Sequence, residues 1–210
     1  MIALGIRYLT GYSVSMDLSR QRAEWPPHPA RLFMAMAAAF FETGSDAGER
    51  AALEWLEAQP PPDLCAPPAQ CRETVEVYVP VNDSHGGIGK RSREPRTFPT
   101  VRPDSDSVYF LWQGEPGRAI RDSLESLCGK VTRLGHSSSL VQMWVVEAGR
   151  EPEPNLYADS NRPGEGLRVP SAGLLNYLEE CFNGMEVEQY FELQEEIAAA
   201  KGKKAKALKE

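Results

Sequence analysis

The sequence predicts an α+β fold in which helices pack on one face of a four-stranded antiparallel sheet. Three observations lead to this prediction. Short segments of alternating or β-branched hydrophobic residues occur four times, amphipathic or apolar helical segments separate the first from the second and the third from the fourth, and 41% of the 210 residues are hydrophobic. A chain of that length and composition can bury a core of its own.

The first half of this pattern begins with a strand at residues 2–8, where apolar residues alternate with small or polar ones. A Pro-rich loop then leads to Pro29, which suits the first turn of a helix. Residues 30–41 are apolar on nearly all sides, which indicates a helix buried on most of its surface. A second helix over residues 48–59 ends before the three prolines at 60–62.

The second half repeats the alternation of strand and helix. Alternating valines predict a second strand at residues 75–81, and a β-branched and aromatic segment predicts a third at 108–112. A helix with one apolar stripe follows over residues 116–129, and a fourth strand over 139–148. The order strand, helix, strand, strand, helix, strand is the ferredoxin-like or RRM-like βαββαβ arrangement, which we assign to residues 1–150.

The remaining residues, 151–210, form a helical extension that we expect to lead into a second domain outside this sequence. They begin with a Pro- and Gly-rich segment, after which Ser171 is expected to cap a short helix that ends at Phe182. Residues 186–210 place acidic residues first and basic residues last, as the helix dipole favours.

The connection between the second and third predicted strands, residues 82–107, carries the unusual charge of this protein. It is 26 residues long, whereas loops beyond roughly 12–15 residues that lack structure of their own are commonly functional or disordered. The stretch 85–103 has a net charge of +4 and the rest of the chain −11. Its five basic residues are Lys90, Arg91, Arg93, Arg96 and Arg102.

Two interpretations of this basic arm stay open. It is a solvated loop, or it binds a phosphate backbone, since arginine pairs with phosphate through two parallel hydrogen bonds. In the second case Phe98 can stack on an unpaired base. The net charge of −7 restricts any contact with nucleic acid to a local surface of this kind.

A second polar segment, RLGHSSSLV, lies at the start of the fourth predicted strand. Its candidate RNA-binding residues are Gly135, His136, Ser137, Ser138 and Ser139. The alternative is a polar turn in which the serine hydroxyls satisfy backbone groups. His136 is also a weak candidate for a catalytic base, although the sequence places no second histidine or lysine beside it.

The sequence predicts neither a cofactor nor a metal. Four scattered cysteines form no close pair of the kind that tetrahedral zinc sites use, and Cys128 and Cys181 lie on apolar faces as small core residues do. No window holds the roughly 18 apolar residues of a membrane span, and the first residues do not resemble a secretory signal. We therefore expect a cytoplasmic protein that contacts no membrane.

Three strings carry a resemblance to a known family: IRYLTGYSVSM, EWPPHPARLFMAMAAAF and LGHSSSLV. Over residues 1–182 they resemble the amino-terminal half of the fused RAMP-superfamily protein of type I-U (I-G) CRISPR systems. The resemblance implies a Cascade subunit that binds the 5′ handle of CRISPR RNA and caps the backbone filament. It also implies that repeat-cutting chemistry belongs to a carboxy-terminal half, which we expect to lie outside these residues.

The resemblance implies partners as well: CRISPR RNA, the filament backbone subunit, the large subunit and, indirectly, target DNA. The arm at residues 82–107 is similar to the thumb that related subunits fold against the filament and the RNA. Our interpretation is a non-catalytic RNA-binding subunit. The alternatives are a metal-independent endoribonuclease that uses His136 or His85, and a protein-interaction module whose arm docks on an acidic partner.

Overall fold

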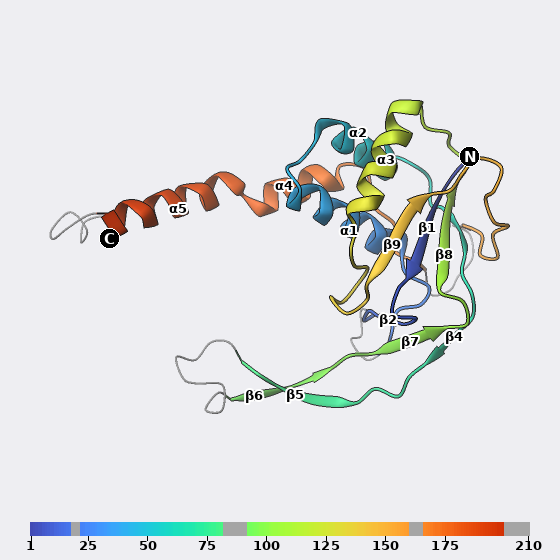
Figure 1. Cartoon of the computed structure of the whole chain (residues 1–210), viewed down its shortest axis with the longest axis horizontal. Helices are drawn as coiled ribbons and strands as arrows, with labels where there is room; N and C mark the ends of the chain where they lie inside the picture. Colours follow the sequence, from blue (N-terminus) through green and yellow to red (C-terminus); the bar gives the residue numbers. More distant parts are fainter. Residues whose placement is uncertain (18–21, 82–91, 160–165, 200–210) are drawn as a thin grey trace. The chain divides into compact units, whose positions relative to one another are not determined.

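The computed structural model is shown in Figure 1. It describes residues 1–17, 22–81, 92–159 and 166–199. The chain forms two compact units, Met1–Ser171 and Ala172–Glu210. The first unit extends beyond residue 150 because Leu156 pairs with Leu64, and the Ala30 N–H donates to the Arg168 carbonyl.

The first unit is built on a four-stranded antiparallel sheet with the order β3-β8-β1-β9. Its strands are β1 (Ile2–Tyr8), β3 (Asp63–Cys65), β8 (Ser107–Trp112) and β9 (Val141–Val145). The first strand in sequence is central, since Leu4 pairs with Phe110 on one side and with Val145 on the other. The strands predicted first, third and fourth are therefore confirmed.

Three helices lie together on one side of this sheet (Figure 1). They are α1 (Pro29–Glu42), α2 (Ala47–Glu57) and α3 (Arg118–Lys130). Their bounds lie close to the predicted ones, because proline opens α1 and the Asp46 carboxylate caps α2 by accepting from the N–H groups of Gly48 and Glu49. Arg121 of α3 donates to the Val146 carbonyl just after β9, which fixes this helix to the sheet.

The opposite face of the sheet has a small core of its own. Ala3, Leu111 and Val146 are buried there, and Trp144 and Tyr109 pack against them. The Trp144 indole lies directly over Gly5, where any Cβ would collide with it. β1 is therefore covered on both faces, and its alternation in the sequence reflects side-chain size more than exposure.

The second predicted strand, residues 75–81, does form a strand, but the prediction that it joins the central sheet was wrong. Among the described residues, β5 (Glu76–Pro80) pairs only with β6 (Arg93–Thr97), and β3 takes the place beside β8 in the central sheet. β3 was not predicted, because it has only three residues and lies between Pro-rich segments. Its pairing with β8 identifies it as a strand.

The connection between the second and third predicted strands contains regular structure in its described residues, 92–107, which the sequence did not predict. β6 and β7 (Thr100–Pro103) fall within it. β7 pairs with β4 (Ala69–Cys71) and with the short β2 (Ser13–Val14), so the arm is a two-stranded ribbon whose base joins a three-stranded sheet. Residues 82–91 lie outside the described part of the chain.

The second unit contains α4 (Leu174–Phe182) and α5 (Gly184–Ala199). The predicted cap at Ser171 was wrong, since α4 begins after Gly173 in a left-handed conformation and no side chain caps it. Cys128 is buried as expected, whereas Cys181 of α4 is exposed. Within the described ranges, no helix has both the length and the apolarity to span a membrane.

Candidate nucleic-acid interface

The polar segment before β9 folds as a tight turn that is attached to β2. Gly135 has φ of +96°, and a Cβ there would lie 2.8 Å from the Val14 carbonyl oxygen, so both its conformation and its surroundings favour glycine. The His136 N–H donates to the same carbonyl over 2.8 Å. The turn therefore has one well-defined position against β2.

Ser139 completes this attachment from the interior. Its side chain is fully buried, and its hydroxyl accepts from the Val14 N–H at 2.7 Å and donates to the Val14 carbonyl at 3.2 Å. This is the structural role that the sequence left open for the serines. Of the five candidate residues in this segment, Ser139 is therefore the buried one, and its hydrogen bonds to Val14 hold the turn against β2.

His136 and Ser137 are the exposed residues of the turn, and Ser138 is half-buried. The His136 Nδ1 lies 2.9 Å from the Ser138 hydroxyl and accepts a longer hydrogen bond, 3.3 Å, from the Ser138 N–H. An amide N–H can only donate, so Nδ1 is the acceptor and the neutral ring carries its proton on Nε2. The turn therefore presents an imidazole donor at its surface.

The structure brings this turn together with the base of the basic arm. Phe98 lies between β6 and β7, and its ring centroid is 5.0 Å from that of His136 with an angle of 64° between the planes. This is an edge-to-face contact of the kind that aromatic rings prefer. Two segments that the sequence singled out separately thus meet in space.

A cavity of about 290 Å³ opens beside this ring pair. Its lining residues are Val14, Ser15, Met16, Asp17, Arg31, Phe98 and His136. Arg31 comes from α1, so the cavity joins the first helix, the arm and the polar turn. Arg31 could not be singled out from the sequence, because a single arginine at the start of an apolar helix has no distinctive spacing.

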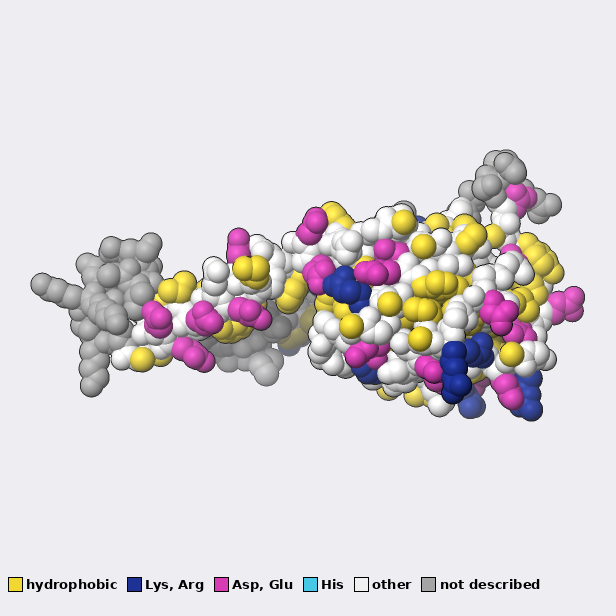
Figure 2. Space-filling model, turned by 90° about the horizontal axis from the view of Figure 1, so that it is seen from above, with side chains coloured by type: hydrophobic (Ala, Val, Ile, Leu, Met, Phe, Trp, Pro, Cys, Tyr) yellow, Lys and Arg dark blue, Asp and Glu magenta, His cyan; other side chains and the backbone are white. Residues whose placement is uncertain are grey.

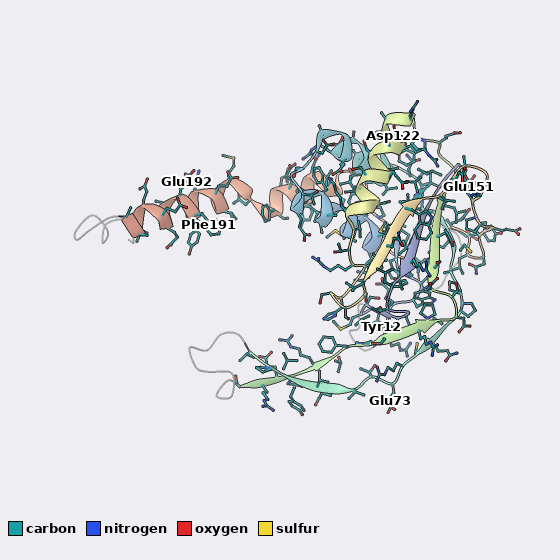
Figure 3. The ribbon with its side chains drawn as sticks, in the orientation of Figure 1. Tyr12, Glu73, Asp122, Glu151, Phe191 and Glu192 are labelled. Atoms are coloured by element: carbon teal, nitrogen blue, oxygen red, sulfur yellow. The ribbon has the colours of Figure 1, made fainter. Side chains whose placement is uncertain are left out.

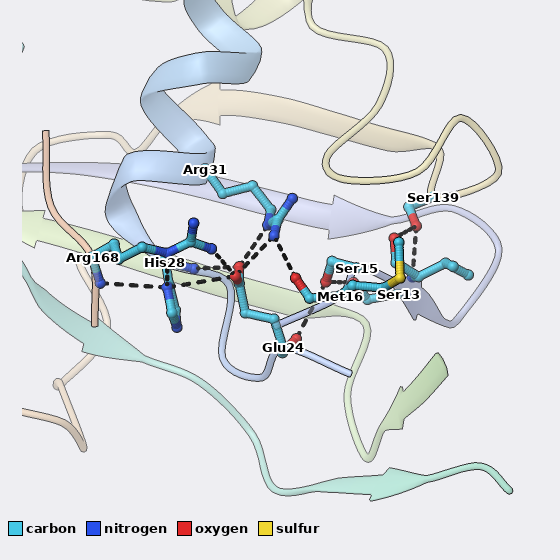
Figure 4. A network of polar contacts seen from close by, with 9 residues as sticks. Ser13, Ser15, Met16, Glu24, His28, Arg31, Ser139 and Arg168 are labelled. Carbon is cyan, nitrogen blue, oxygen red and sulfur yellow. Dashed lines mark hydrogen bonds and ion pairs between the residues drawn. The ribbon is translucent and has the colours of Figure 1, made fainter. Parts of the chain in front are cut away.

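Arg31 is held in place by Glu24, the most deeply buried carboxylate of this region (Figure 4). The Glu24 side chain is 1% exposed, and the Arg31 guanidinium binds both its oxygens, at 2.6 and 2.8 Å. Arg168 binds the same carboxylate at 2.6 Å, and the His28 N–H donates to it at 3.2 Å. Arg31 also donates to the Met16 carbonyl at 3.1 Å, which ties α1 to the cavity wall.

Burial and charge act against each other at Glu24. Burial alone raises the pKa of this carboxyl, but the hydrogen bond and charge of Arg31, together with His28, hold the pKa below its ordinary value. For His28, burial lowers the pKa below its ordinary value of 6.5; the charge of Glu24 opposes this effect, and the charges of Arg168 and Arg31 add to it. The cluster is therefore composed of ionised Glu24, two arginines and a neutral His28 at neutral pH.

The candidate basic residues of the arm have different surroundings. Lys90 and Arg91 lie outside the described residues. Arg93 and Arg102 are exposed and form no salt bridge with any residue that the structure describes, whereas Arg96 pairs with Glu94 at 2.7 Å. That pair is more than half exposed on both sides, so it contributes little to stability and can exchange for a phosphate.

Comparison with known proteins agrees with the resemblance seen in the sequence. The model of a family of CRISPR-associated proteins, the GSU0054 family, matches residues 2–191. The chain belongs to this family of CRISPR-associated proteins. No curated protein matches the chain.

Among solved structures, the chain is similar to a CRISPR protein from Archaeoglobus fulgidus, with 13% sequence identity and a TM-score of 0.33. The similarity covers 70% of this chain and 65% of that one, which is less than two thirds of its length.

Proposed function

We propose that this family member is an RNA-binding subunit of a type I (I-U/I-G) Cascade complex that holds and caps the 5′ handle of the guide RNA. The observation that carries the proposal is the contact of Phe98 with His136, which joins the basic arm to the polar turn on one surface. Single-stranded RNA is recognised through phosphate contacts, stacking on aromatic rings and hydrogen bonds to splayed bases. The arm supplies arginines for the phosphate contacts. Phe98 and His136 supply rings for stacking, and His136 also supplies a hydrogen-bond donor for a base.

We assign the first unit to the ferredoxin-like RAMP type on the same grounds. The central sheet with the elements β1, α1, β3, β8, α3 and β9 supports this assignment, with α2 as an addition after α1. In this proposal the partners are CRISPR RNA, the filament backbone subunit and the large subunit, and a further domain after residues 151–210 carries the repeat-cutting activity.

RNA binding is tested with a labelled RNA that carries the repeat-derived 5′ handle, titrated across a salt series. The variant replaces Arg93, Arg96 and Arg102 with Gln. Each phosphate contact on a single strand contributes roughly −0.7 to the slope of log affinity against log salt concentration. If each arginine contacts one phosphate, the magnitude of the slope therefore decreases by about 2 in the variant. The matched control, Arg50, Arg118 and Arg150 all changed to Gln, removes the same charge from sites outside the arm.

The same samples on a denaturing gel separate the alternatives. Intact RNA with a slope that depends on the arm supports a binding subunit. Cleaved RNA that disappears with His136→Ala replaces this proposal with an endoribonuclease. Equal binding by the arm variant and its control contradicts the role of the arm in holding RNA and favours a protein partner for it.

A further inference from the structure

We propose that the cavity between Phe98, His136 and Arg31 binds a single unstacked nucleobase, and that it prefers a base with an exocyclic carbonyl oxygen. This inference rests on the proposed RNA-binding function and specifies one contact within it. The seven lining residues named above lie in the described part of the chain. None of them belongs to the row of arginines that is expected to contact phosphate.

The size of the cavity fits one base. Pockets for drug-sized ligands enclose roughly 300–1,000 Å³, and this one, at about 290 Å³, is just below that range. It is partly open to solvent, so a base can enter while its ribose and phosphate remain outside. A folded RNA helix cannot enter, which restricts the ligand to a single strand.

The ring pair provides the stacking surface. Phe98 is 37% exposed although it is apolar, and it lines the cavity. Because its ring is inclined by 64° to that of His136, only one of the two rings can lie parallel to a given base. The other then offers its edge, and the edge of His136 carries the Nε2–H donor. Stacking and a directed hydrogen bond therefore act on the same base.

The donors of the cavity favour a carbonyl oxygen, and the Asp17 carboxylate, which also lines the cavity, accepts from an N–H such as the one beside the carbonyl of uracil or guanine. His136 offers Nε2–H, and Arg31 offers Nη1, since its Nε and Nη2 are bound to Glu24 and Met16. The backbone acceptors are already in use, because the Val14 carbonyl accepts from His136 and Ser139, and the Met16 carbonyl accepts from Arg31. Uracil, guanine and cytosine present an exocyclic carbonyl oxygen, and adenine does not.

Arg31 is well suited to this role because its position is fixed before RNA arrives. The two-point contact with buried Glu24 restricts the guanidinium to one orientation. Binding then loses little side-chain entropy, because the guanidinium is already ordered in the free protein. This explains how an arginine that is largely committed to an internal ion pair still contributes to a ligand site.

The test uses a twelve-residue oligouridylate with one 5-iodouridine, which forms photo-crosslinks with aromatic side chains. We expect mass spectrometry to locate the crosslink at Phe98 or His136. Phe98→Ala should weaken the binding of unmodified oligouridylate about tenfold, as loss of one stacked base does, without a change in the salt slope. Tyr78→Ala is the matched control, because Tyr78 is an exposed aromatic residue of the arm outside the cavity.

The preference for a carbonyl is tested with His136→Ala. The ratio of affinities for oligouridylate and oligoadenylate should fall about fivefold, as expected for one hydrogen bond. Bases in free oligoadenylate stack on one another, which lowers its affinity equally for wild type and variant. The comparison of the two ratios therefore removes this effect. Far-ultraviolet circular dichroism checks that each variant is folded.

The outcomes distinguish this inference from the proposed function. Salt-dependent binding with crosslinks outside the cavity, and with unchanged affinity in both Phe98→Ala and His136→Ala, overturns the base pocket and leaves an RNA-binding arm. Unequal effects of Phe98→Ala and Tyr78→Ala together with the expected crosslink support the pocket. Absence of any binding by wild type, even at low salt, overturns both.

Discussion

Glu24 is a carboxylate with almost no contact with water, and its charge is balanced by Arg31 and Arg168. We predict that Glu24→Gln destabilises the protein by about 3 kcal/mol, because breaking a buried ion pair leaves the remaining charges uncompensated. The value lies at the lower end of the usual range, since Arg31 and Arg168 are 23% and 42% exposed. Urea denaturation of wild type and variant measures the difference.

The control for this prediction is Glu94→Gln, which breaks the exposed pair with Arg96. Exposed pairs contribute less than about 1 kcal/mol, so this variant should unfold near the wild-type midpoint. Equal effects of the two substitutions would show that the Glu24 cluster adds no more than a surface pair.

Stability should also fall on acidification in two steps. The pKa of His28 is lowered in the folded state, so the unfolded chain binds a proton first and stability decreases as the pH drops below 6.5. The pKa of Glu24 is lowered too, and its contribution is lost as the pH falls further, below its ordinary value of 4.5. Both groups bind more protons when unfolded, so both effects have the same sign.

Melting temperatures measured from about pH 8 to about pH 3 test this order. His28→Asn, which retains an acceptor near the position of Nδ1 and does not titrate there, should remove the first step and leave the second. A first step of unchanged size in this variant would assign it to another group.

Single residues also show where sequence reasoning succeeds. Gly135 and His136 were selected from a short polar string, and they do form a surface turn beside the arm. The buried role of Ser139 could not be predicted, because it depends on hydrogen bonds to Val14, more than a hundred residues away. The same holds for Glu24 and Arg168, which are 144 residues apart.

Among the elements of the first unit, the arm has the least support from packing. The side chains of β5 and β6 are exposed apart from Pro80 and Thr97, which are half-buried, whereas those of β1 are almost all buried. A two-stranded ribbon without an apolar face is only marginally stable. We predict that amides of β5 and β6 exchange with deuterium much faster than those of β1, as hydrogen-exchange mass spectrometry can measure.

Bound RNA should slow exchange in the arm, since binding would order it together with the strand it holds. The amides of β1 serve as the internal reference, because they exchange through opening of the core. Slow exchange in β5 and β6 without RNA would mean that contacts other than the described ones stabilise the arm.

Elements were predicted well wherever their own residues carry the pattern. α1, α2, α3 and β9 follow from apolar periodicity and from proline or glycine at their ends. β3 and β7 were missed, because strands of three and four residues are defined by the strands they pair with. Alternation at residues 75–81 identifies β5 as a strand, but it cannot say which sheet the strand joins.

For the whole molecule, the distribution of charge matters more than the total. A net charge of −7 opposes general binding of RNA, while the arm concentrates positive charge in one segment. Figure 2 shows acidic and hydrophobic side chains along α5, and Figure 3 shows Phe191 and Glu192 pointing in different directions from it. The described part of this helix contains five glutamates and no lysine or arginine.

The side chains of α5 are mostly exposed along the part of this helix that the structure describes. None of its described side chains is buried, and Met185, Tyr190 and Phe191 are each more than half exposed. Asn183, with φ of +49°, ends α4 in a left-handed conformation, so a chain that stops at this residue keeps the natural end of that helix.

We predict that a chain of residues 1–183 melts at the same temperature as residues 1–210, within about 2 °C. The reason is that none of the described side chains of α5, which the shorter chain lacks, is buried. It should also self-associate less, since exposed aromatic side chains on one helix promote contacts between molecules. Differential scanning calorimetry and analytical ultracentrifugation measure the two effects. A clearly lower melting temperature for the shorter chain would mean that α5 buries apolar side chains in the protein in solution, and that its exposed residues belong to the core of a larger assembly of the same chain.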